Sequence, residues 1–283
     1  MQKQAVVWLN DDLLPLSQAR VSVDDRGFLY GDGFFETLRA EDGRVFFLAE
    51  HLKRLRASAQ AFRLSFPAGI PWEKRLQELF AANGLFTGSA AVKILLTRGE
   101  APGLGLPATL SPTLVIYARP YLPPGPEEYA TGWPVVVFPE RRTTFIGRHK
   151  SLNYLFYLAA RQYALDQGAR EALILEADGS VSEGAATSLV LLLDGRLVSP
   201  AAASALPGVT VAVLARSLKR RGKSLEQTPL SLSQVEQADG LWLANSLMGL
   251  MPVSSLEGRP LPLSQETSRF LMDCLAAEAI KTG

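Results

Sequence analysis

The sequence of 283 residues has little of the chemistry that marks exported, membrane-bound or nucleic-acid-binding proteins. Its one cysteine, Cys274, excludes an intramolecular disulfide and fits a reducing cytoplasm. No apolar run approaches the roughly 20 residues that span a bilayer, so we expect neither export nor membrane insertion. The 29 basic and 28 acidic side chains leave a net charge of +1, which favours neither nucleic acid nor an anionic membrane as a partner. We expect a cytoplasmic protein that binds a small molecule.

The composition and length predict an ordinary folded protein with two domains. Hydrophobic residues make up 47% and charged residues 20% of a chain that is longer than one typical domain. The stretch PYLPPGPEEY, residues 120–129, holds four prolines and one glycine, and we predict an interdomain linker without a helix or central strand. The predicted domains are therefore residues 1–119 and 130–283.

Hydrophobic spacing in the first domain predicts strands followed by two helices and two more strands. Alternating apolar residues predict a hairpin around Asn10–Asp12 and a second strand pair joined by the turn Glu41–Gly43. Apolar steps of three and four residues predict helices over 49–62 and 71–83. The runs AAVKILLTRG and TLVIYARP are typical of strands.

The second domain alternates between the same two patterns. We predict a helix that begins at Ser151 as N-cap and ends at Gly168, a helix over 209–221 and a last helix over 264–280. Strands are expected in GWPVVVF, in three pieces of the stretch 171–199, and in GLWLAN.

Lys150, in the segment GRHKSLNYL, is a candidate for covalent chemistry. A lysine forms a Schiff base only after its amine loses a proton, and a nearby cation such as the adjacent Arg148 favours that loss. The alternative is a solvated charge at a helix start, which describes most lysines. Glu183 follows in VSEGAATS, where small residues at 184–186 allow close approach of a bound object; otherwise it is a surface strand residue.

Three further stretches are candidates for anion binding. The segment LPGVT, residues 206–210, places unpaired N–H groups at a helix start; alternatively, Thr210 is an ordinary N-cap with Gly208 as a turn residue. Residues 245–246 either close the other side of an anion site or only form a turn. Arg54, in HLKRL, either pairs with the anion or is a solvated helix charge.

Six motifs in order resemble the class IV aminotransferases, the fold-type-IV pyridoxal-phosphate enzymes: YGDGFFETLR, HLKRL, KSLNYL, GSVSEGAATS, LPGVT and NSLMGLMPV. That family includes branched-chain and D-amino-acid aminotransferases and aminodeoxychorismate lyase, and the resemblance extends from about Trp8 to Val253. It implies an α/β (α+β) fold with a smaller N-terminal α/β domain, a larger C-terminal domain with a barrel-like β-sheet, and pyridoxal 5'-phosphate at their junction. It also implies a homodimer.

The resemblance assigns roles to individual residues. Lys150 would bind the cofactor as a Schiff base and later move the substrate proton, Glu183 would pair with the pyridine nitrogen, and Tyr154 would bind the phenolic oxygen. Phosphate binding is expected from Arg54, Gly208, Val209, Thr210, Asn245 and Ser246. Thr37 would assist proton transfer or serve only as a strand residue, and the substrate is expected to contact Tyr30, Arg98, Arg148 and Met248. No metal is expected, and His51 is expected to be structural.

Two motifs, YGDGFFETLR and NSLMGLMPV, look closest to aminodeoxychorismate lyase. The expected reaction converts 4-amino-4-deoxychorismate to pyruvate and 4-aminobenzoate, a folate precursor. One departure is Leu104–Leu106, where lyases carry a second arginine; this leaves Arg98, with Arg148 as a substitute, to recognise a dicarboxylate. The alternatives are an aminotransferase for D-amino or branched-chain amino acids and a non-enzymatic protein that binds a phosphorylated ligand.

Overall fold

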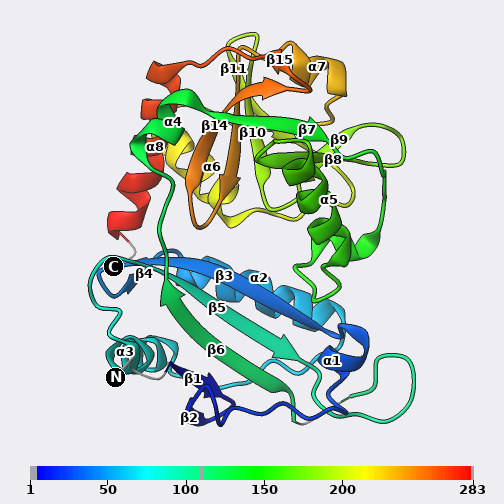
Figure 1. The fold of residues 1–283 in the computed structure, drawn as a ribbon, viewed down its shortest axis with the longest axis vertical. Helices are drawn as coiled ribbons and strands as arrows, with labels where there is room; N and C mark the ends of the chain where they lie inside the picture. Colours follow the sequence, from blue (N-terminus) through cyan, green and yellow to red (C-terminus); the bar gives the residue numbers. More distant parts are fainter. Residues whose placement is uncertain (1–4, 109–110, 282–283) are drawn as a thin grey trace. The chain divides into compact units, whose positions relative to one another are not determined.

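The computed structural model describes residues 5–108 and 111–281, and the chain divides into two compact units (Figure 1). Unit 1 contains the chain up to Pro123 together with Lys150–Asn153, and unit 2 contains Pro124–His149 and the chain from Tyr154 onward. The predicted domains differ from this division because they placed all of residues 130–283 in the second domain. In the described part of the chain, no helix has the length and apolar character needed to cross a membrane.

Unit 1 is built on a six-stranded sheet in which every neighbouring pair is antiparallel. The strand order is β2-β1-β6-β5-β3-β4, so the three longest strands lie side by side in the middle. The strands are β1 (Val6–Leu9), β2 (Asp12–Pro15), β3 (Gly33–Glu41), β4 (Arg44–Val45), β5 (Ser89–Thr97) and β6 (Thr113–Pro120).

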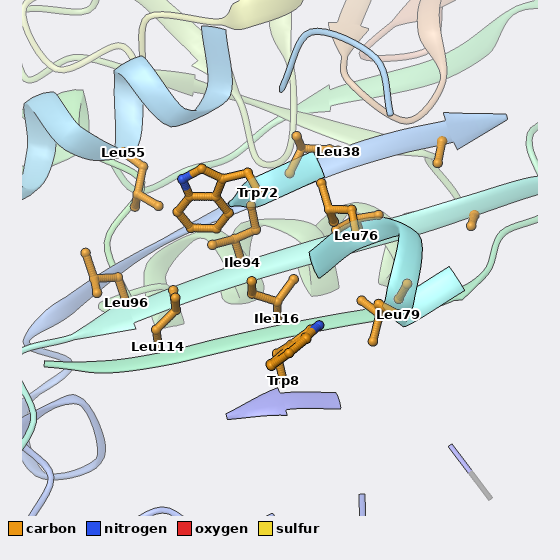
Figure 2. Close-up of a cluster of buried hydrophobic side chains, with 14 of the residues drawn as sticks. Trp8, Leu38, Leu55, Trp72, Leu76, Leu79, Ile94, Leu96, Leu114 and Ile116 are labelled. Carbon is orange, nitrogen blue, oxygen red and sulfur yellow. The ribbon is translucent and has the colours of Figure 1, made fainter. Parts of the chain in front are cut away.

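Two helices bury one face of this sheet. Helix α2 (Leu48–Ala61) and helix α3 (Trp72–Asn83) pack against alternate residues of β3, β5 and β6, as Figure 2 shows for the side chains around Leu38 and Ile94. The period of two along each strand and of three to four along each helix is what brings these residues to one core. A short helix, α1 (Arg26–Tyr30), precedes β3 and begins at the N-cap Asp25.

Unit 2 contains a nine-stranded sheet of mixed direction. The path is β12-β11-β10-β13-β14-β7-β8-β9, with β15 paired to β14. Strand β9, at one end of this path, also contacts β10 and β11, so the sheet curls into a half-barrel. The strands are β7 (Trp133–Val137), β8 (Glu171–Leu175), β9 (Val181–Gly184), β10 (Ser188–Leu193), β11 (Arg196–Pro200), β12 (Leu225–Thr228), β13 (Gly240–Asn245), β14 (Gly249–Leu256) and β15 (Arg259–Pro260).

The helices of unit 2 cover this sheet, and α6 packs beside α8. The pair is joined by an ion pair of 2.6 Å between Arg220 Nη1 and Glu278 Oε1 and by a hydrogen bond of 2.8 Å from Ser217 Oγ to the Cys274 carbonyl. The helices are α4 (Pro126–Thr131), α5 (Leu155–Asp166), α6 (Val209–Arg220), α7 (Leu232–Glu236) and α8 (Gln265–Lys281), with a 3₁₀ turn η1 (Phe145–Arg148).

The proline-rich stretch differs from its prediction because part of it is helical. Helix α4 begins at Pro126, a position where proline costs no hydrogen bond, and Glu128 accepts from the Gly125 N–H at 3.1 Å. The predicted cap of α5 is also wrong. Ser151 forms an extended bridge with Phe34 of β3, so the helix begins only at Leu155.

The side chain of Leu38 is completely buried in the hydrophobic core of unit 1. We expect Leu38→Ala to lower the free energy of unfolding by about 3 kcal/mol, because the lost contacts leave a cavity. Leu104→Ala, at a side chain that is 88% exposed, is the control and should change it by less than about 0.5 kcal/mol. Urea denaturation followed by tryptophan fluorescence measures both, and equal midpoints for the two variants would contradict this packing.

Candidate functional site

Lys150 lies in a short extended segment beside β3, not at the start of a helix. The Phe35 N–H donates to the Lys150 carbonyl at 2.8 Å, and the Leu152 N–H donates to the Gly33 carbonyl at 2.9 Å. These two bonds flank the Phe34–Ser151 bridge, so the main chain from the Lys150 carbonyl to the Leu152 N–H is held by the sheet. The lysine is therefore placed by a rigid element, which is the arrangement that a reactive side chain requires.

Two lysine amines approach the ring of Phe35. The Nζ atoms of Lys150 and Lys93 each lie 4.6 Å from the ring centroid, so the two nitrogens are separated by no more than twice that distance. Burial and the charge of Arg119 lower the pKa of Lys93. Thr37 pairs with Lys93 in the β3–β5 register. This face of the unit 1 sheet is thus cationic and partly desolvated, which suits an anionic ligand.

A buried charge cluster holds Arg54. Glu36 is fully buried and accepts from Arg54 Nε at 2.8 Å and from Arg54 Nη2 at 2.6 Å. His51 Nδ1 lies 2.7 Å from Oε2 of the same carboxylate, the oxygen that also accepts from Arg54 Nη2. Burial lowers the pKa of His51, so the ring is neutral and its Nδ1–H donates to Glu36. His51 is therefore structural, as expected, and Arg54 is a fixed guanidinium and not a solvated helix charge.

Arg98 differs from its predicted role in substrate binding because its donors are already used. Its guanidinium is fully buried and donates five hydrogen bonds, two to Asp32 and one each to the carbonyls of Phe62, Arg63 and Pro107. An arginine has five N–H donors, so none is left for a substrate carboxylate. Arg98 instead fixes the loop that follows β5.

In unit 2, Glu183 lies on β9 and is 5% exposed. Its Oε1 accepts from the Tyr157 hydroxyl at 2.7 Å, and its Oε2 accepts from the Leu206 N–H at 3.1 Å. The carboxylate is one wall of a cavity of about 550 Å³ that also has Gly208, Ser188 and Arg148 in its lining. The surface-strand alternative for Glu183 is therefore wrong, because the side chain is buried and faces a cavity.

The start of α6 in the same cavity can receive an anion. The N-cap is Gly208, not Thr210 as in the turn alternative, and this N-cap offers no side chain to the first N–H groups of the 12-residue helix. A Cβ on Gly208 would lie 2.4 Å from Ser188 Oγ, so a larger residue there would require the Ser188 hydroxyl to move. Helix N–H groups, a helix dipole, apolar walls and a buried carboxylate match a phosphorylated pyridine ring, so these residues fit pyridoxal phosphate.

The turn at 245–248 uses its own polar groups. Asn245 Oδ1 accepts from the N–H groups of Leu247 at 3.0 Å and Met248 at 2.9 Å, which is the turn alternative for this side chain. Met248 differs from its prediction as a substrate contact, because its side chain is 3% exposed and packs in the hydrophobic core of unit 2. A phosphate contact of Ser246 remains a prediction.

Packing inside unit 2 explains why the residue directly after Glu183, at position 184, is a glycine. A Cβ on Gly184 would lie 2.1 Å from Thr187 Oγ1 and 3.2 Å from Glu171 Cγ. Glu171 is 1% exposed and accepts from Thr187 Oγ1 at 3.1 Å and from the Ala186 N–H at 3.2 Å. Glycine at position 184 thus makes room for the buried carboxylate of Glu171, and burial raises the pKa of that carboxyl.

The other predicted residues are placed as follows. The Tyr154 hydroxyl lies 3.4 Å from the Ala185 carbonyl, in the segment that follows Glu183. The Arg148 side chain is exposed at the end of η1 and lines the cavity, whereas Tyr30 is 52% exposed at the end of α1. Their contacts with a cofactor or substrate remain predictions. The structure gives His149 a lowered pKa, from burial and then from Arg148, but no role.

Sequence reasoning missed Glu36 and Tyr157. The alternation along β3 already places residue 36 on the same face as Phe34 and Leu38, and an acid at a core position requires a cationic partner. Tyr157 is three residues after Tyr154, so the two side chains share a helical face, and their ring centroids are 4.9 Å apart. Its partner Arg142 has no signal in the sequence.

The chain thus combines a mixed α/β fold and a curled half-barrel sheet with two candidate groups. One unit contains a lysine held by the sheet, and the other contains a helix start that can receive an anion beside a buried carboxylate.

Comparison with known proteins identifies the family. The family described as Amino-transferase class IV matches residues 33–256. A "Putative branched-chain-amino-acid aminotransferase" of Methanocaldococcus jannaschii is 32% identical over 258 residues, which cover 89% of this chain and 88% of that protein. A D-alanine aminotransferase of Bacillus licheniformis is 27% identical over an alignment of 290 positions, which covers 98% of this chain and 99% of that protein. The branched-chain amino acid aminotransferase of Escherichia coli superposes with a TM-score of 0.85, at 26% identity over 96% of this chain and 93% of that one.

The chain belongs to the class IV aminotransferase family. It is an enzyme of that family, with a fold that matches fold-type IV aminotransferase structures, and its cofactor is pyridoxal 5'-phosphate. The alternative of a non-enzymatic protein that binds a phosphorylated ligand is therefore wrong.

The cluster around Glu36 generates a stability prediction. We expect Glu36→Gln to lower the free energy of unfolding by about 3 kcal/mol, because it leaves the Arg54 guanidinium without its buried carboxylate. Glu78→Gln, which breaks an exposed pair with Lys74, is the control and should cost less than about 0.5 kcal/mol. Urea denaturation at neutral pH measures both.

Glu36→Gln also tests how the stability of the protein depends on pH. Burial would raise the pKa of Glu36, but Arg54 and then His51 outweigh it and hold that pKa below the ordinary value of 4.5. The contribution of Glu36 to stability is therefore complete above pH 4.5 and is lost as the pH falls through the folded-state pKa. The wild type should lose stability more steeply below that pH than Glu36→Gln does. Parallel stability curves would contradict the assignment.

Proposed function

We propose that this enzyme is an aminotransferase that moves the amino group of a branched-chain amino acid to a 2-oxo acid. The observation that carries the proposal is the likeness, over 89% of the chain, to a relative named for branched-chain amino acids. An acceptor such as 2-oxoglutarate or pyruvate completes the reaction. A second candidate is transfer from a D-amino acid, which is supported by a D-alanine aminotransferase that matches 98% of the chain.

The lyase interpretation has less support. It needs cations for both carboxylates of 4-amino-4-deoxychorismate, and the arginine assigned to that task, Arg98, donates all its N–H groups to the protein. The named relatives are aminotransferases. The aminotransferase alternative therefore fits the comparisons with named relatives better.

In the proposed site, Lys150 binds the aldehyde carbon of the cofactor between reaction cycles. When bound, pyridoxal phosphate supplies an electron-withdrawing ring that stabilises negative charge at the substrate Cα. The Lys150 amine would take the Cα proton of the amino substrate as a general base and return a proton as a general acid. The rigid attachment of residues 150–152 to β3 keeps this amine in place through both steps.

The remaining residues hold the cofactor. Glu183 keeps the ring nitrogen protonated, and Tyr154 donates to the phenolic oxygen. The N–H groups of Val209 and Thr210 at the start of α6, the Arg54 guanidinium and Ser246 bind the phosphate. Thr37, Tyr30 and Arg148 are proposed to contact the substrate.

Transfer and elimination are distinguished by their products. We expect the cofactor-loaded protein to form the matching oxo acid from L-leucine, L-isoleucine or L-valine with 2-oxoglutarate, and to release no 4-aminobenzoate from 4-amino-4-deoxychorismate. Chromatography of both reaction mixtures measures this. Turnover of D-alanine alone would favour the second candidate, and 4-aminobenzoate formation would restore the lyase.

Lys150→Ala is the matching variant. We expect it to lose transfer activity and the visible absorbance of the bound cofactor, while the far-UV circular dichroism stays unchanged, because the amine is lost but the pairing of residues 150–152 uses only main-chain groups. Lys53→Ala, at a lysine of α2, is the control. Persistent covalent attachment in Lys150→Ala would mean that another lysine carries the cofactor.

The homodimer implied by the resemblance also stays a proposal. Exposed apolar side chains on α1, with Phe28 at 74% and Leu29 at 49%, are the kind of surface that a second copy covers. Sedimentation equilibrium of the holoenzyme should give twice the chain mass of 30.7 kDa, and a monomer would contradict this.

A further inference from the structure

Two hydrogen bonds from neutral donors fix the Glu183 carboxylate within unit 2. One oxygen accepts from the phenol of Tyr157 at 2.7 Å, and the other accepts from the main-chain N–H of Leu206 at 3.1 Å. Hydrogen bonds donated to a carboxylate favour its ionised form. Because both oxygens accept a hydrogen bond, the plane of the carboxylate has a set direction beside the cavity that Glu183 lines.

Tyr157 has a fixed hydrogen-bond direction. Arg142 Nη2 donates to the Tyr157 oxygen, because a guanidinium has donors only, so the single O–H of the phenol points to Glu183. Burial, and then the charge of Glu183, raise the pKa of Tyr157, so the phenol keeps its proton. Tyr157 is thereby a permanent donor to Glu183.

Arg142 supplies a positive charge on the other side of the Tyr157 hydroxyl from Glu183. Its guanidinium carbon lies 4.4 Å from the centroid of the Tyr157 ring and 4.5 Å from that of Phe156. Its buried Nε has no hydrogen-bond partner, and within residues 5–108 and 111–281 it forms no ion pair with a carboxylate. The negative charge nearest to it along the hydrogen-bond chain is that of Glu183, on the other side of the phenol.

We propose that Tyr157 is a positioning residue that holds the Glu183 carboxylate ionised and oriented for the ring nitrogen of pyridoxal phosphate, with Arg142 balancing its charge through the phenol. This rests on the proposed role of Glu183. A phenol uses one lone pair of one carboxylate oxygen, whereas an ionised carboxylate has about four such positions. The hydrogen bond from Tyr157 therefore orients the carboxylate and leaves it able to accept from the ring nitrogen as well.

The direct measurement is the protonation state of the ring nitrogen. The wild-type holoenzyme, loaded with pyridoxal phosphate labelled with ¹⁵N in the ring, should give the nitrogen shift of a pyridinium. Tyr157→Phe removes only the hydroxyl, and its shift should move toward that of a neutral pyridine. Tyr163→Phe is the matched control, because Tyr163 lies on the same helix and its hydroxyl has no partner among the described residues. It should give the wild-type shift.

Cofactor affinity provides a second readout that does not depend on turnover. Tyr157→Phe should weaken the binding of pyridoxal phosphate to the apoenzyme about tenfold, because it removes one hydrogen bond to a charged group. A cofactor analogue with a carbon in place of the ring nitrogen should bind to both proteins equally, since the effect passes through that nitrogen. Equal weakening of both ligands would overturn the proposal and indicate a packing role.

Two further variants separate the possible failures. Glu183→Gln should also shift the nitrogen signal; if it does not, the proposed role of Glu183 is wrong. If Glu183→Gln shifts the signal and Tyr157→Phe does not, the positioning role of Tyr157 is wrong. Arg142→Met keeps the phenol and should shift the signal in the same direction by a smaller amount, and it decides the question if Tyr157→Phe fails to fold. Circular dichroism establishes the fold of each variant.

Discussion

The arrangement of the candidate lysine depends on two main-chain hydrogen bonds between residues 150–152 and β3. They return a four-residue piece of the middle of the chain to the sheet of unit 1, between two stretches that belong to unit 2. The lysine consequently shares a rigid surface with Phe35, and the carboxylate that holds Arg54 comes from the next residue of the same strand. A side chain on a flexible loop would have no fixed relation to those groups.

The buried carboxylates differ in whether they contact only protein groups or also line a cavity. The charge of Glu36 is balanced by Arg54, and His51 donates a hydrogen bond to it. Glu176 accepts from serine and threonine hydroxyls that join loops of unit 2. Glu171 fills the space left by a glycine. Of these four acids, Glu183 is the one that lines the cavity. Its access to that space suits it to exchange a proton or a hydrogen bond with a ligand.

The arginine side chains also differ in the groups to which they donate. The donors of Arg98 are consumed by the loops around it, whereas Arg142 acts on a tyrosine. The family resemblance assigned Arg98 to the substrate, as the arginine that remains to recognise a carboxylate where the lyases carry a second one. Whether its donors are open depends on which carbonyl groups the neighbouring loops bring to it, and those come from positions 62, 63 and 107.

The sequence alone determined the long helices, the central strands and the family, because each depends on local periodicity or on ordered short motifs. It also indicated Lys150, Glu183 and the glycine-started helix at 208–210. Only the tertiary structure decided that Ser151 pairs with a strand and not with its own helix, and that Tyr157 lies between Arg142 and Glu183. These outcomes depend on contacts between residues far apart in the chain. Their free energy comes from pairing and burial, which no local pattern contains.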